Sequence, residues 1–416
     1  MNRLLNLIRN DIPGNYNEAF NLYKRKENVL CNFNNIIIPP YEVLIHASSY
    51  CNLTCQWCIG EHILVEGKGN SYYMPKKNDN ILPNVIHDEK KMIKVIDNIL
   101  SYEKNVNLQI GGYHINKKFS VENISFSGIT GEPLIAQKAI TAAIRMIKNK
   151  GKRTGLFTNG LLIDINNCNI LSRLDYINIS IDAGTNQTYN TLKCGGRTSQ
   201  KFELDKVYKN IALLNAAKKE FKTHLEINCS CILYPDNFNE IYLLASNLKK
   251  MGVSTLRLKK DIYGERMLNS QQKEMCLNLI NKIKNDLEDN HFKLINIHDL
   301  DDDKEQEQDF EKCFISKMMA AVGSDGNLYP CNYHPKKGGY TLGSLIDIPF
   351  QTIWEARERK SLEEKLPGIC PSVCDPFKTR SNKLFNKLLK IYEKEGISGI
   401  SNIISEAEIY FGGNNK

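Results

Sequence analysis

The sequence has no apolar run long enough to cross a membrane, although the chain contains 416 residues. A membrane-spanning helix requires about 18 or more consecutive apolar residues, and polar residues interrupt every apolar stretch of this chain before that length. The first ten residues also lack the apolar core and the small-residue cleavage site of a secretory signal. We therefore expect a cytoplasmic protein without a membrane segment.

Internal repeats, long low-complexity tracts and a strong excess of one charge are also lacking. Lysine and arginine number 55 against 47 acidic residues, which gives a net charge of +8. Hydrophobic residues make up 42% of the chain and charged residues 25%, as in folded globular proteins rather than disordered ones. A charge of this size permits an acidic partner but does not require one.

Cysteine, in contrast, is abundant, with 13 residues. Disulfide bonds are rare in the cytoplasm, so clustered cysteines there are first interpreted as metal ligands. Two groups stand out along the chain: Cys51, Cys55 and Cys58, and then Cys313, Cys331, Cys370 and Cys374. Five scattered cysteines are interpreted as ordinary core residues, because a buried free cysteine packs well: Cys31, Cys168, Cys229, Cys231 and Cys276.

The region 41–260 alternates between β-rich runs and helical patterns, which is typical of βαβ units and a parallel sheet. The six runs are 41–47, 121–128, 153–158, 175–182, 223–233 and 254–260. Six repeats favour an α/β fold with a partial (β/α)6 TIM-like barrel over a closed eightfold one. Several strands also alternate apolar and polar residues, which predicts a polar, ligand-binding interior; edge strands facing water are the alternative.

Further segments flank the barrel. We predict an N-terminal helical extension (1–40), the barrel (41–298), an acidic linker (299–311), a small α+β auxiliary domain (312–376) and a basic helical segment (377–416). The linker holds eight acidic residues and one lysine. The stretch 378–394 is basic with helically spaced apolar residues, which favours a helix packed on the body over a nucleic-acid-binding patch. Residues 106–120 are expected to form a small hairpin.

The first cysteine group lies on one short loop directly after the first strand. Three thiolates can ligate three irons of a 4Fe–4S cluster and leave the fourth iron open to a substrate or cofactor. Structural zinc is the competing interpretation, and it needs a fourth ligand. His46 and His62 are near enough in the sequence to supply one, so the spacing alone leaves both metals open.

The spacing of three and two residues between these cysteines, with Trp57 before the last, resembles the radical S-adenosylmethionine (SAM) superfamily. Three further motifs fall in the order of that family at the ends of later strands: 128–133 (GITGEP), 158–160 (TNG) and 180–184 (SIDAG). The resemblance covers about residues 41–260. One departure is Thr130, where the family commonly has a second glycine, and it puts the contact geometry there in doubt.

The resemblance implies that Cys51, Cys55 and Cys58 ligate a 4Fe–4S cluster whose open iron binds the amino and carboxylate groups of SAM. An electron from a donor such as flavodoxin or ferredoxin would then cleave SAM to methionine and a 5′-deoxyadenosyl radical, which abstracts hydrogen from a substrate carbon. The implied cofactor-binding residues are Trp57, Gly131, Glu132, Asn159, Ser180, Asp182, Asn228 and Arg257.

The second cysteine group resembles the SPASM and Twitch auxiliary-cluster domains of radical SAM enzymes. A strong turn at 324–327 (SDGN) is expected to form a hairpin that brings Cys313 and Cys331 together. A full SPASM domain carries seven cysteines, and this region has four, so a shortened, Twitch-like version with one auxiliary 4Fe–4S cluster is expected. Four thiolates would ligate it fully, whereas three would leave an iron open; zinc is the alternative.

Three residues are candidates for catalysis. Cys194 is placed in a glycine-rich loop on the rim of the barrel, where it would return a hydrogen atom, or it is an ordinary loop cysteine. Lys259 and Asp261 end or follow the sixth strand, where each would act as a base or be a surface charge.

Taken together, the sequence predicts a radical SAM enzyme whose substrate is a peptide or protein side chain or a small molecule such as a sugar alcohol. The alternative is a non-catalytic iron–sulfur or zinc protein that binds nucleic acid.

Overall fold

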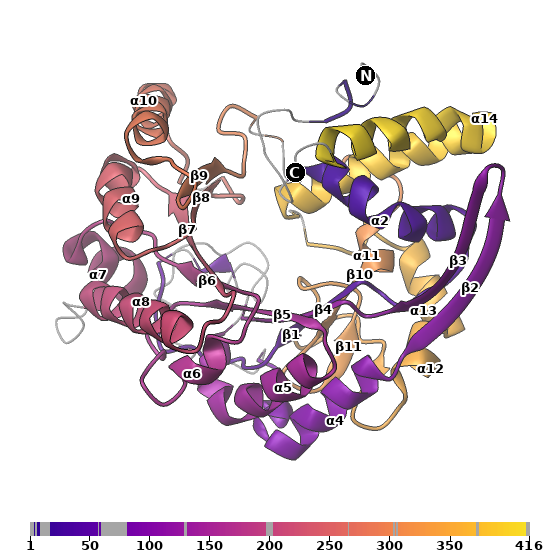
Figure 1. Ribbon diagram of the computed structural model, residues 1–416, viewed down its shortest axis with the longest axis horizontal. Helices are drawn as coiled ribbons and strands as arrows, with labels where there is room; N and C mark the ends of the chain where they lie inside the picture. Colours follow the sequence, from indigo (N-terminus) through magenta and orange to yellow (C-terminus); the bar gives the residue numbers. More distant parts are fainter. Residues whose placement is uncertain are drawn as a thin grey trace.

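We describe the fold from a computed structural model of the chain. The structure describes residue 4 and the ranges 6–8, 17–56, 58–59, 81–128, 131–196, 203–264, 266–302, 304, 307–371 and 374–412. Figure 1 shows a curved sheet surrounded by helices, with the hairpin and the C-terminal helix α14 on one side.

The sheet has ten strands among the described residues, in the order β12-β11-β10-β1-β4-β5-β6-β7-β8-β9. Its parallel part contains β1 (Glu42–His46), β4 (Asn123–Ser127), β5 (Arg153–Thr158), β6 (Tyr176–Ser180), β7 (Glu226–Leu233), β8 (Thr255–Lys260) and β9 (Lys293–Asn296). The first six of these are the six predicted strands, which confirms the partial-barrel prediction.

Helices connect successive parallel strands and cover the outer face of the sheet (Figure 1). They are α4 (Glu89–Leu100), α5 (Gln137–Asn149), α6 (Cys168–Leu171), α7 (Asn186–Cys194), α8 (Glu203–Glu220), α9 (Ile241–Lys250) and α10 (Ser270–Leu287). Strand β6 shows why the chain folds this way: Ile177 and Ile179 are fully buried in the main core, and the intervening Asn178 points to the opposite face. The apolar half of each such strand therefore packs on helices, and the polar half faces the barrel interior.

The sheet continues into the cysteine-rich C-terminal region. Strand β10 (Met319–Val322) pairs parallel with β1, and β11 (Asn327–Tyr329) and β12 (Gly343–Ser344) follow antiparallel. The predicted turn joins β10 and β11, with Gly326 at a φ of 80° that favours glycine. Three helices complete this region: α11 (Ile315–Met318), α12 (Phe350–Trp354) and α13 (Arg357–Glu364). Pairing with β10 covers the edge of β1 and seats this region against the barrel.

A second hydrophobic core lies beside the barrel. It is formed by α2 (Glu18–Phe33), by α14 (Pro376–Gly412) and by the hairpin of β2 (Glu103–Ile110) and β3 (Tyr113–Ser120). The basic stretch of α14 buries Leu384, Phe385 and Leu388 here, which confirms the helix packed on the body. The hairpin is longer than the predicted one and begins earlier.

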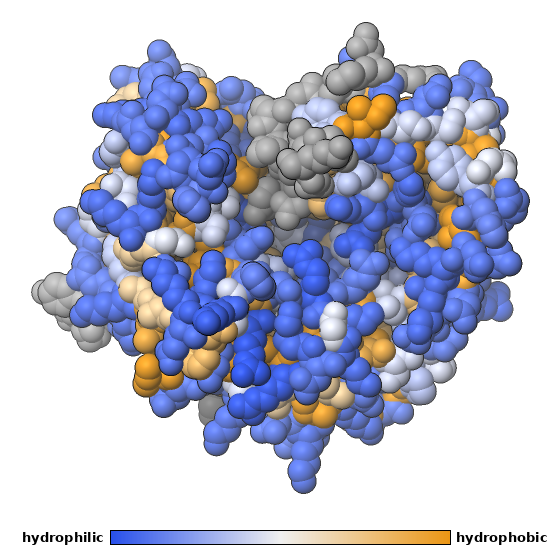
Figure 2. Space-filling model, viewed as in Figure 1, coloured by the Kyte–Doolittle hydropathy of each residue, from blue (hydrophilic) through white to orange (hydrophobic). Residues whose placement is uncertain are grey.

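Hydrophilic side chains cover most of the face seen in Figure 2, with hydrophobic ones in small groups. None of the helices in the described part of the chain has both the length and the apolar character needed to cross a bilayer.

Candidate active site

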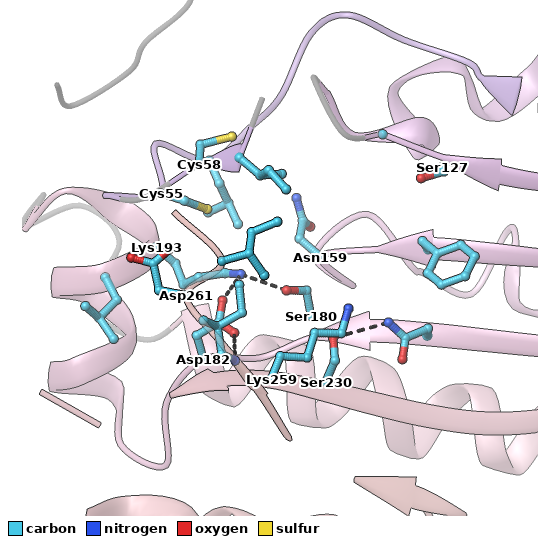
Figure 3. A pocket seen from close by; sticks show the side chains of 18 of the residues that line it. Cys55, Cys58, Ser127, Asn159, Ser180, Asp182, Lys193, Ser230, Lys259 and Asp261 are labelled. Atoms are coloured by element: carbon cyan, nitrogen blue, oxygen red, sulfur yellow. Dashed lines mark hydrogen bonds and ion pairs between the residues drawn. The ribbon is translucent and has the colours of Figure 1, made fainter. Parts of the chain in front are cut away.

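A cavity of about 310 Å³ opens where the parallel strands end at their carboxyl sides. All three cysteines of the first group line it. Strand ends contribute most of its polar wall, namely Ser127, Thr158, Asn159, Asn178, Ser180, Asp182, Ser230, Lys259, Lys260 and Asp261. The C-terminal region closes one side with Tyr333 and Asp375. The polar barrel interior expected from strand alternation is thus present, and it faces the cysteine loop (Figure 3).

Backbone contacts hold the cysteine loop over this cavity. Two amides of the loop, those of Thr54 and Gln56, donate to the carbonyls of Lys193 (3.1 Å) and Leu192 (2.8 Å) at the end of α7. At the start of the loop, the Ser49 amide donates to the Asn84 side chain over 2.7 Å. The loop is therefore positioned by backbone groups before any metal binds.

Gly131 lies against the same loop. A Cβ atom at this position would lie 2.3 Å from the Ser48 carbonyl oxygen and 2.8 Å from that of Tyr50. A side chain there would push the backbone of the cysteine loop away, so the glycine is required by close approach. Thr130, the departure from the family pattern, lies outside the described residues.

Glu132 joins three segments of the site. Its backbone amide donates to the Tyr50 carbonyl over 2.7 Å. Its carboxylate accepts from the Thr158 hydroxyl at 2.6 Å, the Asn159 amide at 2.8 Å and the Leu134 amide at 3.1 Å. Burial raises the pKa of Glu132, and these donors oppose that rise. The side chain of this predicted cofactor-binding residue thus braces the end of β5, and its backbone supports the cysteine loop.

The most buried ion pair of the cavity joins Lys193 to Asp182. The two charged atoms lie 2.7 Å apart, and the side chains are only 6% and 8% exposed. Lys193 also donates to the Ser180 hydroxyl over 3.1 Å (Figure 3), and Asp182 accepts from the Ile232 amide over 2.8 Å. Burial alone would lower the pKa of Lys193, but the Asp182 carboxylate raises it well above its ordinary value.

Lys193 was not among the predicted site residues. The available signal was its place in the segment after the SIDAG motif, one helix beyond Asp182. The lysine is the next-to-last residue of α7, and the helix carries its ammonium back over the end of β6.

The surroundings of two thiols of the first group, Cys51 and Cys55, disfavour their ionised forms, although each residue is partly exposed. Burial raises the pKa of Cys51 to about 12, and it raises the pKa of Cys55 further, although the Lys193 ammonium opposes that shift. A bound cationic metal core reverses this preference, because a ligating thiol is deprotonated by the metal charge. These three thiols therefore suit a metal cluster better than free thiolate chemistry.

Some of the remaining predicted cofactor-binding residues line the cavity, and others do not. Asn159, Ser180 and Asp182 line the cavity together with Gly131 and Glu132. Asn228 and Arg257 are not among the lining residues; each lies on the same strand face as a lining residue, but two positions earlier along its strand. The alternation of polar and apolar residues predicted the correct strand face for Asn228 and Arg257. It did not give their depth along the barrel, and both were predicted too near the cavity. Trp57 and His62 lie outside the described residues.

The predicted position of Cys194 is wrong. It is the last residue of α7, fully buried in the main hydrophobic core, and it does not line the cavity. The helix continues through Cys194 because Gly195, at a φ of 63°, supplies the left-handed residue that ends it. The glycine-rich loop therefore begins one residue later than expected.

The two predicted bases, Asp261 and Lys259, both line the cavity, but they differ in their hydrogen bonds. Both carboxylate oxygens of Asp261 accept from backbone amides, one from Tyr263 at 3.0 Å and one from Arg266 at 3.1 Å. This residue therefore stabilises the turn after β8. Lys259 makes no such contact with a described residue, and its ammonium is left facing the cavity.

The second cysteine group surrounds the start of α14. Burial raises the pKa of Cys370, and the neighbouring thiols of Cys331, Cys313 and Cys374 raise it further. The Cys331 thiol also raises the pKa of Cys313, as expected if the hairpin brings these two residues together. His334 Nε2 lies 3.7 Å from the Cys370 sulfur, and Asn382 donates to the Cys313 sulfur at 3.6 Å.

Within the described ranges, no three His, Cys, Asp or Glu side chains are gathered so that they could hold one metal ion. A tetrahedral zinc site needs four ligands around a single ion. A 4Fe–4S cluster instead takes each thiolate on a separate iron, and so holds its ligands farther apart. The donors of both groups are thiols, which are the usual ligands of a 4Fe–4S cluster.

Comparison with known proteins identifies the second cysteine region. Residues 313–375 match the SPASM family, an iron–sulfur cluster-binding domain. No curated protein matches the whole chain significantly. SuiB from Streptococcus suis bound to S-adenosylmethionine is similar at a TM-score of 0.51 and 14% identity, with 82% of this chain and 71% of that one covered. The chain therefore shares the fold of SuiB, and its second cysteine region matches the SPASM family.

Two further structures resemble this chain. SuiB bound to the precursor peptide SuiA aligns at a TM-score of 0.51 with 13% identity over 86% of this chain and 74% of that one. The protein anSMEcpe with bound AdoMet aligns at 0.49 with 19% identity, over 88% of this chain and all (100%) of that one.

Proposed function

We propose that this protein is a radical SAM enzyme that modifies a peptide. A bound 4Fe–4S cluster would supply the reductive cleavage of SAM, with an electron from a donor such as flavodoxin or ferredoxin. The 5′-deoxyadenosyl radical formed with methionine would then take a hydrogen atom from a substrate carbon. The observation that carries the proposal is the convergence of Cys51, Cys55 and Cys58 on one cavity. The ends of the neighbouring parallel strands complete that cavity.

The chain's own residues position and enclose the reactants. Backbone contacts from α7 hold the loop that carries the three thiols. The Asn159 amide group, already joined to Asn52 of the loop at 2.7 Å, lies where it would contact SAM. The buried Lys193–Asp182 pair and Ser180 provide a fixed polar surface for the ribose or amino-acid part of SAM.

The SPASM domain supports an oxidative outcome. After hydrogen abstraction the substrate carbon carries one unpaired electron, and its oxidation releases one electron and one proton. A second cluster held by Cys313, Cys331, Cys370 and Cys374 would accept that electron or bind the substrate. Tyr333 and Asp375, each within two residues of a cysteine of this group, line the cavity, so the second cluster would lie near the substrate.

A peptide substrate is favoured over a sugar alcohol by one comparison. SuiB shares the fold of this chain over 86% of the length of this chain, and one structure of SuiB contains the bound precursor peptide SuiA. The nucleic-acid-binding alternative is disfavoured because α14 buries Leu384, Phe385 and Leu388 in the second core. Two basic side chains near the start of this helix, Lys378 and Arg380, are also each only 9% exposed.

Anaerobic reconstitution with iron and sulfide tests the proposal. Two 4Fe–4S clusters require about eight irons per chain, and dithionite with SAM should release 5′-deoxyadenosine. Cys51→Ala should abolish this release and leave about four irons. Cys168→Ala is the matched control, because Cys168 lies on α6 and does not line the cavity, and it should retain both properties.

Two results contradict the proposal. One is 5′-deoxyadenosine release that survives Cys51→Ala. The other is a protein that takes up zinc at both sites without sulfide, which would support a metal-binding protein without radical chemistry.

A further inference from the structure

Lys259 is an ammonium group in the cavity without a matching anion. It lies near the end of β8 and lines the cavity. No hydrogen bond or ion pair joins its side chain to any residue that the structure describes. Burial lowers the pKa of Lys259, and Arg257 lowers it further, while Asp375 and Asp182 raise it. A buried cation without a partner is costly, so a bound anion would be strongly stabilised here.

The carboxylates that line the same cavity are already engaged. Asp182 is paired with Lys193, and Glu132 accepts three hydrogen bonds. Asp261 accepts two backbone amides. Asp375 accepts the backbone amide of Phe377 at 3.0 Å at the start of α14, together with that of Lys378. None of these four carboxylates forms a hydrogen bond or an ion pair with Lys259 in the part of the chain that the structure describes.

The other two lysines of the cavity are engaged as well. Lys193 is in the buried pair, and the ammonium of Lys260 donates to the backbone carbonyl of Asp302. Among the described residues that line the cavity, Lys259 is therefore the lysine whose charge is left for a ligand.

We propose that Lys259 binds a carboxylate of the substrate. This inference rests on the proposed function, because it takes the cavity as the place of reaction. In Figure 3, Lys259 projects from β8 on the other side of the Lys193–Asp182 pair from the labelled cysteines. The amino-acid end of SAM belongs beside the cysteine loop, so the carboxylate at Lys259 is that of the second reactant. It is an acidic side chain or terminus of a peptide, or a small organic acid.

The test uses the anaerobically reconstituted holoprotein loaded with SAM. Random capped decapeptides are selected for binding by mRNA display, and enrichment of Asp and Glu is compared between variants. We expect at least tenfold enrichment with the unaltered protein and with Lys259→Arg, and none with Lys259→Gln. Lys293→Gln is the matched control, since it removes an exposed lysine from the neighbouring strand β9, and it should keep the preference.

Two more measurements identify the source of the carboxylate. Gluconate and glutarate are titrated in parallel; if they bind the unaltered protein at least tenfold more tightly than Lys259→Gln and no acidic peptide is selected, the ligand is a small acid. The SAM affinity of Lys259→Gln should stay within threefold. A tenfold loss would overturn the inference, because the bound carboxylate would then be that of SAM.

The inference is also overturned if acidic peptides are enriched equally with Lys259→Gln, or if neither ligand class binds. Release of 5′-deoxyadenosine without substrate is measured on the same samples. If no 5′-deoxyadenosine is released, the proposed function is contradicted. The binding measurements on peptides and small acids would then still decide whether Lys259 binds a carboxylate.

Discussion

The ammonium of Lys193 lies 2.7 Å from the carboxylate of Asp182, and both side chains are less than one-tenth exposed. The pair connects the end of α7 with the residues after β6, and α7 in turn holds the cysteine loop through its last carbonyls. One buried contact therefore links the part of the site that would hold the cluster with the part that would hold the ribose or amino-acid end of SAM.

Removing one partner of this pair should strongly destabilise the protein. Lys193→Met leaves the Asp182 charge buried and unpaired, which costs about 3–5 kcal/mol, whereas the double variant with Asp182→Asn should recover most of that loss. Urea unfolding of the unaltered protein, Lys193→Met and the double variant measures these changes in the free energy of unfolding. Lys118→Met is the control, because its pair with Glu103 is 57% and 46% exposed and is worth less than about 1 kcal/mol. Equal losses in the single and double variants would show that the pair has no special role.

A methyl group at Gly131 should displace the cysteine loop. The added Cβ would lie 2.3 Å from the Ser48 carbonyl oxygen, which belongs to backbone rather than to a flexible side chain. We expect Gly131→Ala to fold, because the clash is local, but to bind about four irons instead of about eight. Iron analysis and circular dichroism measure the two properties.

Gly112→Ala is the control for this substitution, because nothing lies within 4 Å of its added Cβ. It should bind the full complement of iron. Full iron binding by Gly131→Ala as well would mean that the loop tolerates the displacement.

The sequence predicted those features that depend on neighbouring residues in the chain. The six parallel strands follow from alternation and helical periodicity, and the three cysteines from one short spacing. Features that depend on distant segments were missed. The pairing of β10 with β1 joins residues about 280 positions apart, and no local pattern in either strand specifies the partner.

Two errors at the site have related causes. Alternation assigns a residue to a strand face but does not give its depth along the barrel, so Asn228 and Arg257 were placed at the cavity although they do not line it. Glycines mark the end of a helix only to within a residue or so, and Cys194 was accordingly assigned to a loop although it ends α7. The same error in the helix end explains why Lys193 was missed, because its pairing with Asp182 depends on its position in α7.

Acid should destabilise the protein through His46. This residue, at the end of β1, is 2% exposed, and neither ring nitrogen has a hydrogen-bond partner among the described residues. Burial lowers its pKa to about 3, and Lys378 lowers it further. Below pH 6.5 the unfolded chain binds a proton that the folded protein does not, so stability is lost as the pH falls from 6.5 toward 3.

At pH 5 this contribution amounts to about 2 kcal/mol relative to neutral pH. His46→Leu should therefore lose less stability between pH 7 and pH 5 than the unaltered protein, as measured by urea midpoints of the holoprotein. His114→Leu removes an exposed histidine of β3 and should leave the pH dependence unchanged. An identical pH dependence in His46→Leu would show that this histidine is not held neutral.

The two cysteines Cys374 and Cys194 should respond oppositely to replacement by alanine. Cys374 belongs to the four-cysteine group, where burial and the nearby Cys331 and Cys313 thiols raise its pKa, although Lys378 opposes this. Its loss should weaken or abolish the second cluster, reducing iron from about eight to about four per chain. Cys194 is enclosed in the main core, and Cys194→Ala should keep all the iron and 5′-deoxyadenosine release, losing about 1 kcal/mol of stability. Loss of substrate product with unchanged 5′-deoxyadenosine release in Cys194→Ala would instead revive its role as a hydrogen donor.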